Sequence, residues 1–332
     1  MSLSFPSIGI IGAGAWGTAL AVALDRAGKR VTLWARRAEH AQEIAQKREN
    51  KRYLPKIQIP TTVTVTAEGA ALTACDALIL AVPAQYVRSV CQALAPSLPE
   101  RSPVLIAAKG VEQTTHRLMS EVVTAALPTH PIFILTGPSF ATEVARNLPT
   151  ALTLGGETDG MALAHALSSP TLRLYTTDDI IGAQIGGAVK NVLAIACGIV
   201  MGRGLGENAR AALITRGLAE IARLGLALGA RTETLMGLSG LGDAVLTCSS
   251  PQSRNTSFGI AVGKGEKIET ILATRPSVTE GVSTAAATLG LAHRHGVDMP
   301  VTRAVDLIVR EGADIDQVIA DLLARPLRPE DF

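Results

Sequence analysis

Hydrophobic and polar positions change rhythm once along this chain of 332 residues. Up to about residue 177, short apolar runs alternate with amphipathic segments of helical period. The apolar runs predict strands at residues 7–12, 30–35, 62–66, 77–83, 103–108, 131–136, 150–155 and 172–176. Helices are expected between them at residues 15–27, 38–50, 84–95 and 115–127. Strands that are apolar on both faces and alternate with helices are typical of a parallel sheet covered on both sides.

After residue 177 the strand pattern stops and only helical patterns follow. They predict helices at residues 180–201, 208–228, 284–295 and 301–310, with a glycine-rich stretch between the second and the third. We therefore expect two domains. Residues 1–177 would form an α/β Rossmann-type, doubly wound domain, and residues 178–332 an all-α domain.

Composition narrows the class of protein. Hydrophobic residues make up 47% and charged residues 18%, which suits a buried core rather than disorder. A net charge of +2 and an aromatic content of 3% argue against nucleic acid as a partner. The four cysteines form no CxxC pair and have no His at zinc spacing, so we expect no metal and a reducing compartment. With no signal peptide pattern and no apolar run of membrane length, a cytoplasmic protein without membrane insertion is expected.

The first predicted strand ends in a glycine pattern that suits a dinucleotide. Gly12, Gly14 and Gly17 fill G-x-G-x-x-G between a strand and a helix. The first glycine allows a tight turn, the second lets the backbone approach a pyrophosphate, and the third lets helix and strand pack closely. The helix that follows would present its amides to the phosphates. The alternative is a glycine turn without a ligand.

Two arginines follow the second predicted strand, where an NAD-specific site carries an acid. Arg36 and Arg37 stand there, and the first acid is Glu39. A guanidinium binds a 2′-phosphate in fork geometry, whereas a carboxylate repels it. This pattern favours NADP(H), with NAD(H) also possible. Alternatively, the arginines are solvated at the edge of the sheet.

Lys190 lies in the middle of an apolar, glycine-rich helix. Burial would lower the pKa of its ammonium and make it a better acid near neutral pH, as enzymes tune lysines. Reduction of a ketone requires such an acid, and Gly186 and Gly187 would leave space for substrate and nicotinamide. The alternative is a lysine that reaches the helix end or is paired structurally. Lys190→Met is expected to leave the fold as stable or more stable, because it deletes a buried charge.

Further polar residues stand at strand ends and in glycine-rich turns, where doubly wound sheets bind ligands. Lys109 ends one strand, Gly137 and Ser139 follow another, and Asp243 lies in the helical half. The cluster Ser253, Arg254 and Asn255 offers a hydroxyl, a fork donor and an amide to a small phosphate. Taken alone, that cluster is equally well a solvated loop with a helix cap.

Together these segments resemble the bacterial NAD(P)-dependent sn-glycerol-3-phosphate dehydrogenase family, over residues 8 to about 322. The resemblance is carried by IGAGAWGTAL, LWARR, AVPAQ, AAKG, LTGPSFATEV, GAVKNVLAI, NARAALITRGLAEI, LSGLGD, SRN and TEGVST, in this order. It implies hydride transfer between NAD(P)H and dihydroxyacetone phosphate, giving sn-glycerol 3-phosphate for phospholipid synthesis. It also implies a homodimer.

The resemblance assigns roles residue by residue. Lys190 matches the lysine that transfers the proton. Positions around the substrate are matched by Lys109, Gly137, Ser139, Lys190, Asp243, Ser253, Arg254 and Asn255. Positions near the cofactor are matched by Ala15, Trp16, Arg36, Lys109, Ala141, Arg254, Val278 and Glu280, beside Gly12, Gly14, Gly17 and Arg37 from the motifs above.

Three residues depart from the family's pattern. Thr256 and Ser257 stand where basic residues often follow the SRN triplet, so Arg254 is expected to be the main local positive charge. Thr279 stands where alanine is common, a change we expect to be tolerated. Two other functions stay open at this point. One is a different two-domain hydroxyacid dehydrogenase with a catalytic lysine, and the other is an NADP-binding redox sensor without turnover.

Overall fold

The structure, a computed structural model, describes residues 4–156, 160–274 and 279–326. The chain folds into two compact units. The first comprises Met1–Ala108 and Met119–Ile180, and the second comprises Lys109–Leu118 and Ile181–Phe332. The second unit therefore takes up a ten-residue segment, Lys109–Leu118, that a single division of the sequence near residue 177 leaves in the first.

The first unit is built on an eight-stranded sheet with the order β10-β9-β8-β7-β6-β1-β2-β5. Its strands are β1 (Ser7–Ile11), β2 (Arg30–Trp34), β5 (Thr64–Thr66), β6 (Ala77–Leu80), β7 (Val104–Ile106), β8 (Ile132–Thr136), β9 (Thr150–Gly155) and β10 (Leu172–Thr177). Each corresponds to a strand expected from the apolar runs. A separate hairpin, β3 (Glu49–Asn50) with β4 (Leu54–Gln58), was not expected, because β3 falls within the helix predicted over residues 38–50 and β4 is a short segment with a proline.

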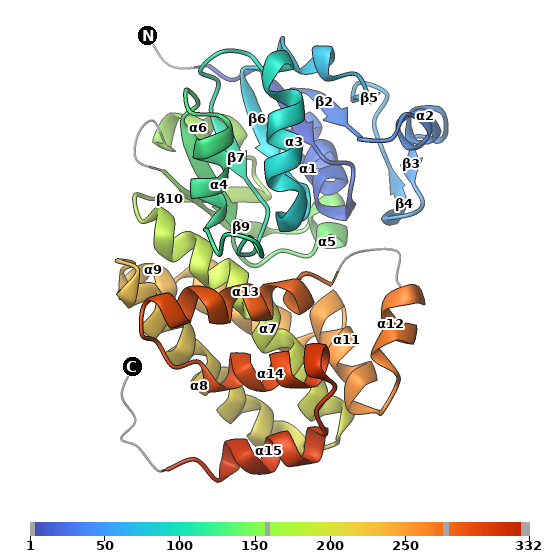
Figure 1. Cartoon of the computed structure of the whole chain (residues 1–332). Helices are drawn as coiled ribbons and strands as arrows, with labels where there is room; N and C mark the ends of the chain where they lie inside the picture. Colours follow the sequence, from blue (N-terminus) through green and yellow to red (C-terminus); the bar gives the residue numbers. More distant parts are fainter. Residues whose placement is uncertain (1–3, 157–159, 275–278, 327–332) are drawn as a thin grey trace. The chain divides into compact units, whose positions relative to one another are not determined.

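Helices connect these strands. They are α1 (Ala15–Arg26), α2 (Ala38–Lys47), α3 (Val87–Leu94), α4 (Met119–Ala126), α5 (Ala141–Ala145) and α6 (Gly160–Leu167), with short 3-10 turns at Gly69–Leu72, Ala84–Tyr86 and Ala95–Ser97. Apolar side chains of α1, α5 and α6 share one core with inward-facing residues of the strands. Figure 1 shows α3 and α4 in front of β6 and β7. Helices thus cover the sheet, as strands that are apolar on both faces require.

The sheet is mostly parallel, as expected, with one antiparallel pairing, that of β9 with β8. The connection between these strands contains only α5, a helix of five residues. That helix packs on α1, where Arg26 donates to the carbonyl of Ala145 at 3.0 Å and to Asn147 Oδ1 at 2.9 Å. Since the connection is held against α1, the chain returns beside β8 in the opposite direction. The other pairings of this sheet are parallel.

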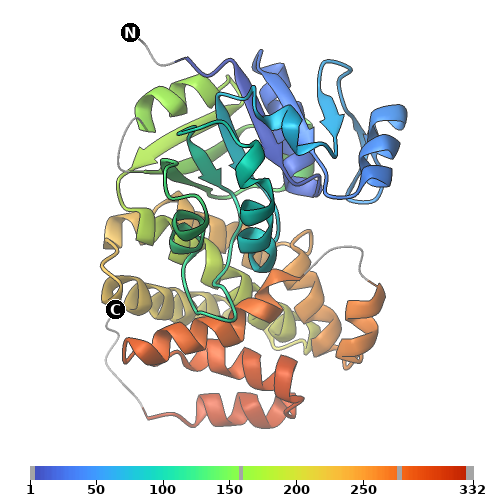
Figure 2. The same cartoon turned by 45° about the horizontal axis from the view of Figure 1, so that its top comes forward.

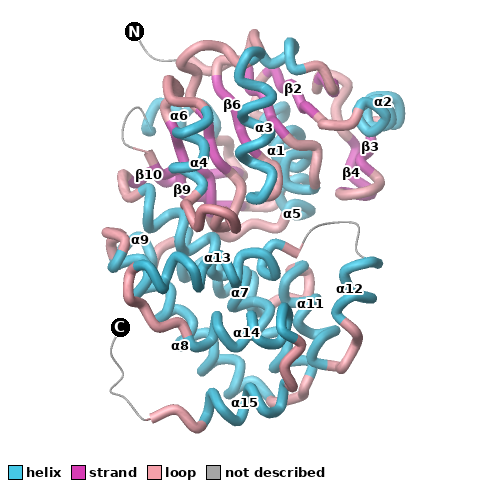
Figure 3. Tube along the Cα trace, viewed as in Figure 1, coloured by secondary structure: helices cyan, strands magenta, loops and turns pink. Residues whose placement is uncertain are grey.

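Outside the loop Lys109–Leu118, the described residues of the second unit form helices and no strands, which confirms the expected fold class (Figure 3). Its helices are α7 (Ile180–Gly202), α8 (Gly206–Ala227), α9 (Thr232–Leu235), α10 (Asp243–Ser249), α11 (Arg254–Gly263), α12 (Ile268–Thr274), α13 (Glu280–Arg294), α14 (Pro300–Glu311) and α15 (Ile315–Leu323), with a π-helical turn at Leu238–Gly242. The four expected helices correspond to α7, α8, α13 and α14. The glycine-rich stretch also folds into short helices, which its weak periodicity did not indicate.

Helix α7 is the central helix of this unit (Figures 1 and 2). It is long and apolar enough to cross a membrane, yet 83% of its most apolar window is buried inside the unit. Its glycines serve helix packing. A Cβ on Gly198 would lie 2.2 Å from the carbonyl oxygen of Thr256, and one on Gly259 would lie 2.1 Å from that of Ile195. The backbones of α7 and α11 therefore approach so closely that only glycine fits at the crossing.

A buried carboxylate joins α8 to α14. Glu220 accepts hydrogen bonds from the backbone amides of Val301 at 2.5 Å and Thr302 at 3.2 Å, at the first turn of α14. Burial raises the pKa of Glu220 to about 7, although these hydrogen bonds act in the opposite direction. This group is remote in sequence from every predicted site residue, and it supplies the N-terminal amides of α14 with an acceptor.

Candidate functional site

The glycine loop after β1 has the form that a pyrophosphate needs. Gly12 has φ +119°, and a Cβ there would lie 2.6 Å from the carbonyl oxygen of Ala81. A Cβ on Gly17 would lie 1.9 Å from the carbonyl oxygen of Gly12, so this glycine allows helix and strand to pack as expected. A Cβ on Gly14 would meet nothing within 4 Å. Nothing in the chain itself therefore requires glycine at that position, which fits a position kept small for a ligand.

Other side chains around this loop fix its shape. Ala15 and Trp16 open α1 and are partly exposed, and no side chain caps the N-terminus of that helix. Asn50, which is fully buried, donates to the carbonyl of Ala13 at 3.0 Å and to Thr18 Oγ1 at 2.8 Å. The sequence analysis missed Asn50, because it lies in the unexpected hairpin. Asn50 thus holds the loop through its hydrogen bonds, and the amides at the start of α1 are left for an anion.

Arg36 lies where the second strand ends, and its guanidinium stacks on an aromatic ring. Its Cζ is 5.5 Å from the centroid of Tyr86, which lies just after β6. Strands β2 and β6 flank β1 in the sheet, so these two side chains meet at the same sheet edge as the glycine loop. Arg37 is exposed and occupies the N-cap position of α2 without a side-chain cap bond. The contact with Tyr86 therefore fixes the position of the Arg36 guanidinium, whereas no such contact is described for Arg37.

Gly137, Ser139 and Ala141 lie together in the turn between β8 and α5. Gly137 has φ +130°, and Ser139 Oγ donates to its carbonyl at 3.2 Å. Ala141 begins α5. This turn lies at the carboxyl end of a strand, where such sheets bind ligands, and it needs glycine at position 137 because of the positive φ.

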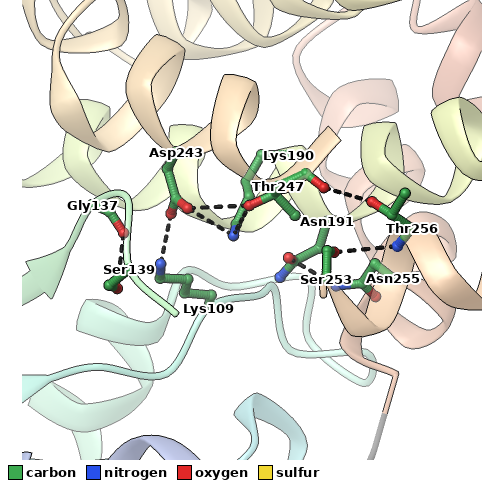
Figure 4. Close-up of polar contacts among 10 residues, drawn as sticks. All are labelled: Lys109, Gly137, Ser139, Lys190, Asn191, Asp243, Thr247, Ser253, Asn255 and Thr256. Atoms are coloured by element: carbon green, nitrogen blue, oxygen red, sulfur yellow. Dashed lines mark hydrogen bonds and ion pairs between the residues drawn. The ribbon is translucent and has the colours of Figure 1, made fainter. Parts of the chain in front are cut away.

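Within the second unit, three of the predicted residues form one buried cluster (Figure 4). Asp243 is 1% exposed and lies between two ammonium groups. Lys109 Nζ donates to its Oδ2 at 2.6 Å, and Lys190 Nζ donates to its Oδ1 at 2.8 Å. Lys190 also donates to Thr247 Oγ1 at 2.7 Å. The carboxylate thus aligns two lysines that are far apart in the sequence.

The electrostatics of the cluster favour proton transfer by Lys190. Burial, assisted by the positive charge of Lys109, lowers the pKa of Lys190 against the attraction of Asp243. Burial alone would raise the pKa of Asp243, but the two lysines outweigh it and lower that pKa. With all three groups ionised, two positive charges surround one negative charge and leave an excess of +1. Such a site attracts an oxygen on which negative charge develops.

Short helices of the glycine-rich stretch build this cluster. Asp243 starts α10, and Thr247 lies one turn later on the same face, so both reach Lys190. Thr256 Oγ1 donates to the carbonyl of Thr247 at 2.5 Å and ties α10 to α11. The sequence analysis missed Thr247, although its spacing from Asp243 could have indicated it. Gly186 does not leave space for a ligand as expected, since a Cβ there would lie 2.6 Å from the carbonyl oxygen of Ser239.

The SRN triplet divides into a structural part and an exposed part. Ser253 caps α11 by accepting from the amide of Thr256 at 3.2 Å. Asn255 is buried, donates to Asn191 Oδ1 at 2.9 Å and accepts from the amide of Gly281 at 3.0 Å. Arg254 is exposed at the first position of α11. Of the three, Arg254 has the side chain best placed to reach a ligand.

The residues that depart from the family's pattern have structural surroundings of their own. Thr256 is fully buried, so a basic side chain at this position would not be exposed without rearrangement. Ser257 donates to the carbonyl of Arg254 at 3.2 Å. Thr279 is the N-cap residue of α13, and Glu280 begins that helix. Val278, predicted near the cofactor, lies outside the described residues.

No group of three or more His, Cys, Asp and Glu that could hold a metal occurs within residues 4–156, 160–274 and 279–326. All four cysteines are buried and unpaired. Burial raises the pKa of Cys91 to about 12, which makes its thiol a poor nucleophile. The chemistry of the described residues is therefore concentrated in the lysines and the carboxylate of the cluster.

Comparisons with known proteins agree with this arrangement. Residues 7–162 match the family model of the NAD-dependent glycerol-3-phosphate dehydrogenase N-terminus, and residues 179–320 match that of its C-terminus. Among similar proteins, the glycerol-3-phosphate dehydrogenase (NAD(P)+) of Parvibaculum lavamentivorans is 52% identical over 332 residues, covering 99% of this chain and 100% of its own. That of Caulobacter vibrioides is 52% identical over 330 residues, with the same coverage of both chains. The crystal structure of glycerol-3-phosphate dehydrogenase from Coxiella burnetii superposes with a TM-score of 0.93 at 40% identity, covering 97% of this chain and 99% of that one.

Proposed function

The chain belongs to the NAD(P)-dependent glycerol-3-phosphate dehydrogenase family, and on that premise we propose that it reduces dihydroxyacetone phosphate to sn-glycerol 3-phosphate with Lys190 as the proton donor. NAD(P)H supplies the hydride when bound. Membership of this family decides against the two alternatives, a different hydroxyacid dehydrogenase and a redox sensor without turnover.

One observation carries the proposal for Lys190. An ammonium has three N–H groups. Two of them donate to Asp243 and Thr247, and the third has no acceptor in the part of the chain that the structure describes. As hydride reaches C2 of the substrate, negative charge develops on the carbonyl oxygen, and this third N–H neutralises it. In the direction of oxidation, neutral Lys190 takes the proton from the hydroxyl.

Asp243 and Lys109 set the state of that lysine. Asp243 holds the ammonium in place, and Thr247 fixes its second N–H, so that the direction of the third is determined. Lys109 lowers the pKa of Lys190 through its charge and neutralises Asp243. The excess positive charge of the cluster is then available to the carbonyl oxygen of the substrate.

The first unit contributes the features that fit a dinucleotide. The amides of the Gly12–Gly17 loop and the start of α1 would hold the pyrophosphate, with Ala15 and Trp16 beside it. We propose that Arg36, supported by Tyr86, binds the 2′-phosphate of NADP(H) and that NADPH is preferred to NADH. Arg37, Ala141 and Glu280 are proposed to lie near the cofactor on the family resemblance.

We propose that the substrate phosphate binds Arg254, which is exposed at the start of α11. Gly137 and Ser139 are proposed to lie near the substrate on the family resemblance. Ser253 and Asn255 support this site mainly by shaping α11, given their internal hydrogen bonds. Residues 1–177 would serve the cofactor and residues 178–332 the substrate, with Lys109 as the exception. From the family resemblance we also propose a cytoplasmic homodimer whose product enters phospholipid synthesis.

The test is a substrate and cofactor panel. Purified enzyme is given NADPH or NADH with dihydroxyacetone phosphate, unphosphorylated dihydroxyacetone and a small 2-oxo acid, and oxidation of the nicotinamide is followed by absorbance. We expect turnover of dihydroxyacetone phosphate with both cofactors, the lower KM being for NADPH. Turnover of the 2-oxo acid alone would contradict the proposal.

A further inference from the structure

The loop that carries Lys109 is anchored to the helical unit rather than to the sheet from which it emerges. It leaves the first unit after Ala108 and returns at Met119. Its base is closed by an antiparallel bridge between Val111 and Leu118. Both of these side chains are buried in the same apolar cluster as Ile185 and Val189, which lie on α7 just before Lys190.

The tip of the loop is tight. The amide of Glu112 donates to the carbonyl of Arg117 at 3.0 Å, and the amide of His116 donates to that of Glu112 at 2.8 Å. His116 has φ +53°, a left-handed conformation that is uncommon for a residue with a Cβ. A backbone in this state persists only where its surroundings hold it.

Helix α13 supplies those surroundings at two points. Arg294 Nη2 donates to the carbonyls of Thr115 at 2.8 Å and His116 at 2.7 Å. One turn earlier, Gly290 packs against the imidazole of His116, because a Cβ on this glycine would lie 2.3 Å from the Cε1 atom of that ring. Gly290 and Arg294 lie one helical turn apart on the same face of α13, and both contact the same loop tip.

We propose that Arg294 and Gly290 are positioning residues, which hold Lys109 on Asp243 by fixing the loop Lys109–Leu118. The inference rests on the proposed function of Lys109 in the cluster. It assigns a part in the reaction to the end of α13, which touches none of Lys109, Lys190 and Asp243 through a described hydrogen bond.

The pH profile of the reaction reports on this anchoring. The charged or titratable groups that act on Lys190 are Asp243, Lys109 and Cys248, and Lys109 lowers the pKa of Lys190. If the loop loosens, Lys109 leaves the cluster and the pKa of Lys190 rises. Oxidation of glycerol phosphate needs neutral Lys190, so the pH at which its kcat reaches half of its plateau should move upward. Loss of stability alone would not move it.

The experiment compares three single variants, Arg294→Ala, Gly290→Ala and Lys109→Met. It also includes two double variants, in which Lys109→Met is combined with Arg294→Ala or with Gly290→Ala. Arg303→Ala removes an exposed arginine of the neighbouring helix α14 and is the matched control. We expect kcat to fall roughly 5- to 30-fold in both α13 variants. Arg294→Ala loses two hydrogen bonds to the loop tip, and the new Cβ of Gly290→Ala displaces the ring of His116. The upward pH shift should accompany the fall in kcat, and Arg303→Ala should behave as wild type. The thermal midpoint of Gly290→Ala should fall less than that of Arg294→Ala, since the higher helix propensity of alanine offsets part of the cost of its clash with His116.

In the Lys109→Met background, neither α13 substitution should lower kcat further, because both act through Lys109. An additional loss there, or a fall in kcat without the pH shift, would show a general structural effect and overturn the inference. Impaired Lys109→Met beside normal Arg294→Ala and Gly290→Ala would overturn this inference alone. Normal kcat in Lys109→Met would overturn the role proposed for Lys109, and the inference with it.

Discussion

Replacing Lys190 with methionine tests both the mechanism and the energetics of the buried cluster. Methionine keeps the length of the side chain and its apolar stem but removes the proton and the charge. Two hydrogen bonds are lost, to Asp243 Oδ1 at 2.8 Å and to Thr247 Oγ1 at 2.7 Å. The structure therefore changes the expectation, drawn from the sequence, that stability would hold or rise. That expectation treated Lys190 as an isolated buried charge, whereas it is half of an ion pair.

The magnitude follows from what Asp243 retains. Removing one partner of a buried ion pair costs about 3–5 kcal/mol when the other charge is left alone. Here Lys109 still donates to Asp243 Oδ2 at 2.6 Å, so part of that cost is avoided. We expect a loss of about 1–3 kcal/mol, or roughly 3–10 °C in the thermal midpoint of a domain of this size. The pKa of Asp243 should rise at the same time, because one of the two groups that lower it is gone.

Catalysis should suffer far more than stability. Loss of a general acid lowers kcat by about 100- to 10,000-fold, and by more if the ammonium also stabilises the oxyanion. The assay measures kcat with NADPH and dihydroxyacetone phosphate, the dissociation constant of NADPH and the thermal midpoint on one preparation. NADPH binding should be unchanged, because the glycine loop and Arg36 belong to the first unit.

A second variant separates the two effects. Lys190→Met combined with Asp243→Asn removes the carboxylate that the single variant leaves short of a partner, so the midpoint should recover while kcat stays low. Recovery of kcat together with the midpoint would make Lys190 a structural lysine. Near-normal kcat in the single variant would refute its role as the proton donor outright.

Three further predictions concern the cofactor, the substrate and pH. Arg36→Asp should raise the KM for NADPH roughly ten- to hundredfold more than that for NADH, the effect of losing one charge-assisted contact; equal effects on both cofactors would mean that Arg36 does not bind the 2′-phosphate. Arg254→Ala should cripple turnover of dihydroxyacetone phosphate and spare the residual turnover of unphosphorylated dihydroxyacetone, whereas comparable losses on both substrates would assign Arg254 to the fold or the cofactor. Folding raises the pKa of Glu220 from 4.5 to about 7, so the folded protein binds the proton more tightly and stability should fall as pH rises through this window, by roughly 3 kcal/mol in all. Urea unfolding between pH 5 and 8 should show this slope in wild type and a flatter one in Glu220→Gln, and parallel curves would contradict it.

The sequence by itself determined the features that depend on neighbours along the chain. Strands, the longer helices and the glycine loop at Gly12 follow from spacings of two, three or four residues, which periodicity and turn chemistry report directly. A lysine in an otherwise apolar helix likewise made Lys190 a candidate site residue, and its role stays a prediction. Strand ends and glycine-rich turns indicated Lys109, Asp243 and Arg254, and the family motifs then assigned them roles, which remain predictions for the experiments above.

Only the tertiary structure decided how distant segments meet. The direction of β9 depends on α5 being held by α1, and the partners of Lys190 lie 53 and 57 residues away in helices too short to give a periodic signal. Gly186 was expected to leave space for a ligand, yet it admits the backbone of Ser239 and Gly240. Likewise, nothing near Lys109 in the sequence indicates Gly290 or Arg294. These partners are determined by packing and hydrogen bonding between segments far apart in the sequence. The free energy of a buried contact depends on distance in space, so it leaves no local pattern in the chain.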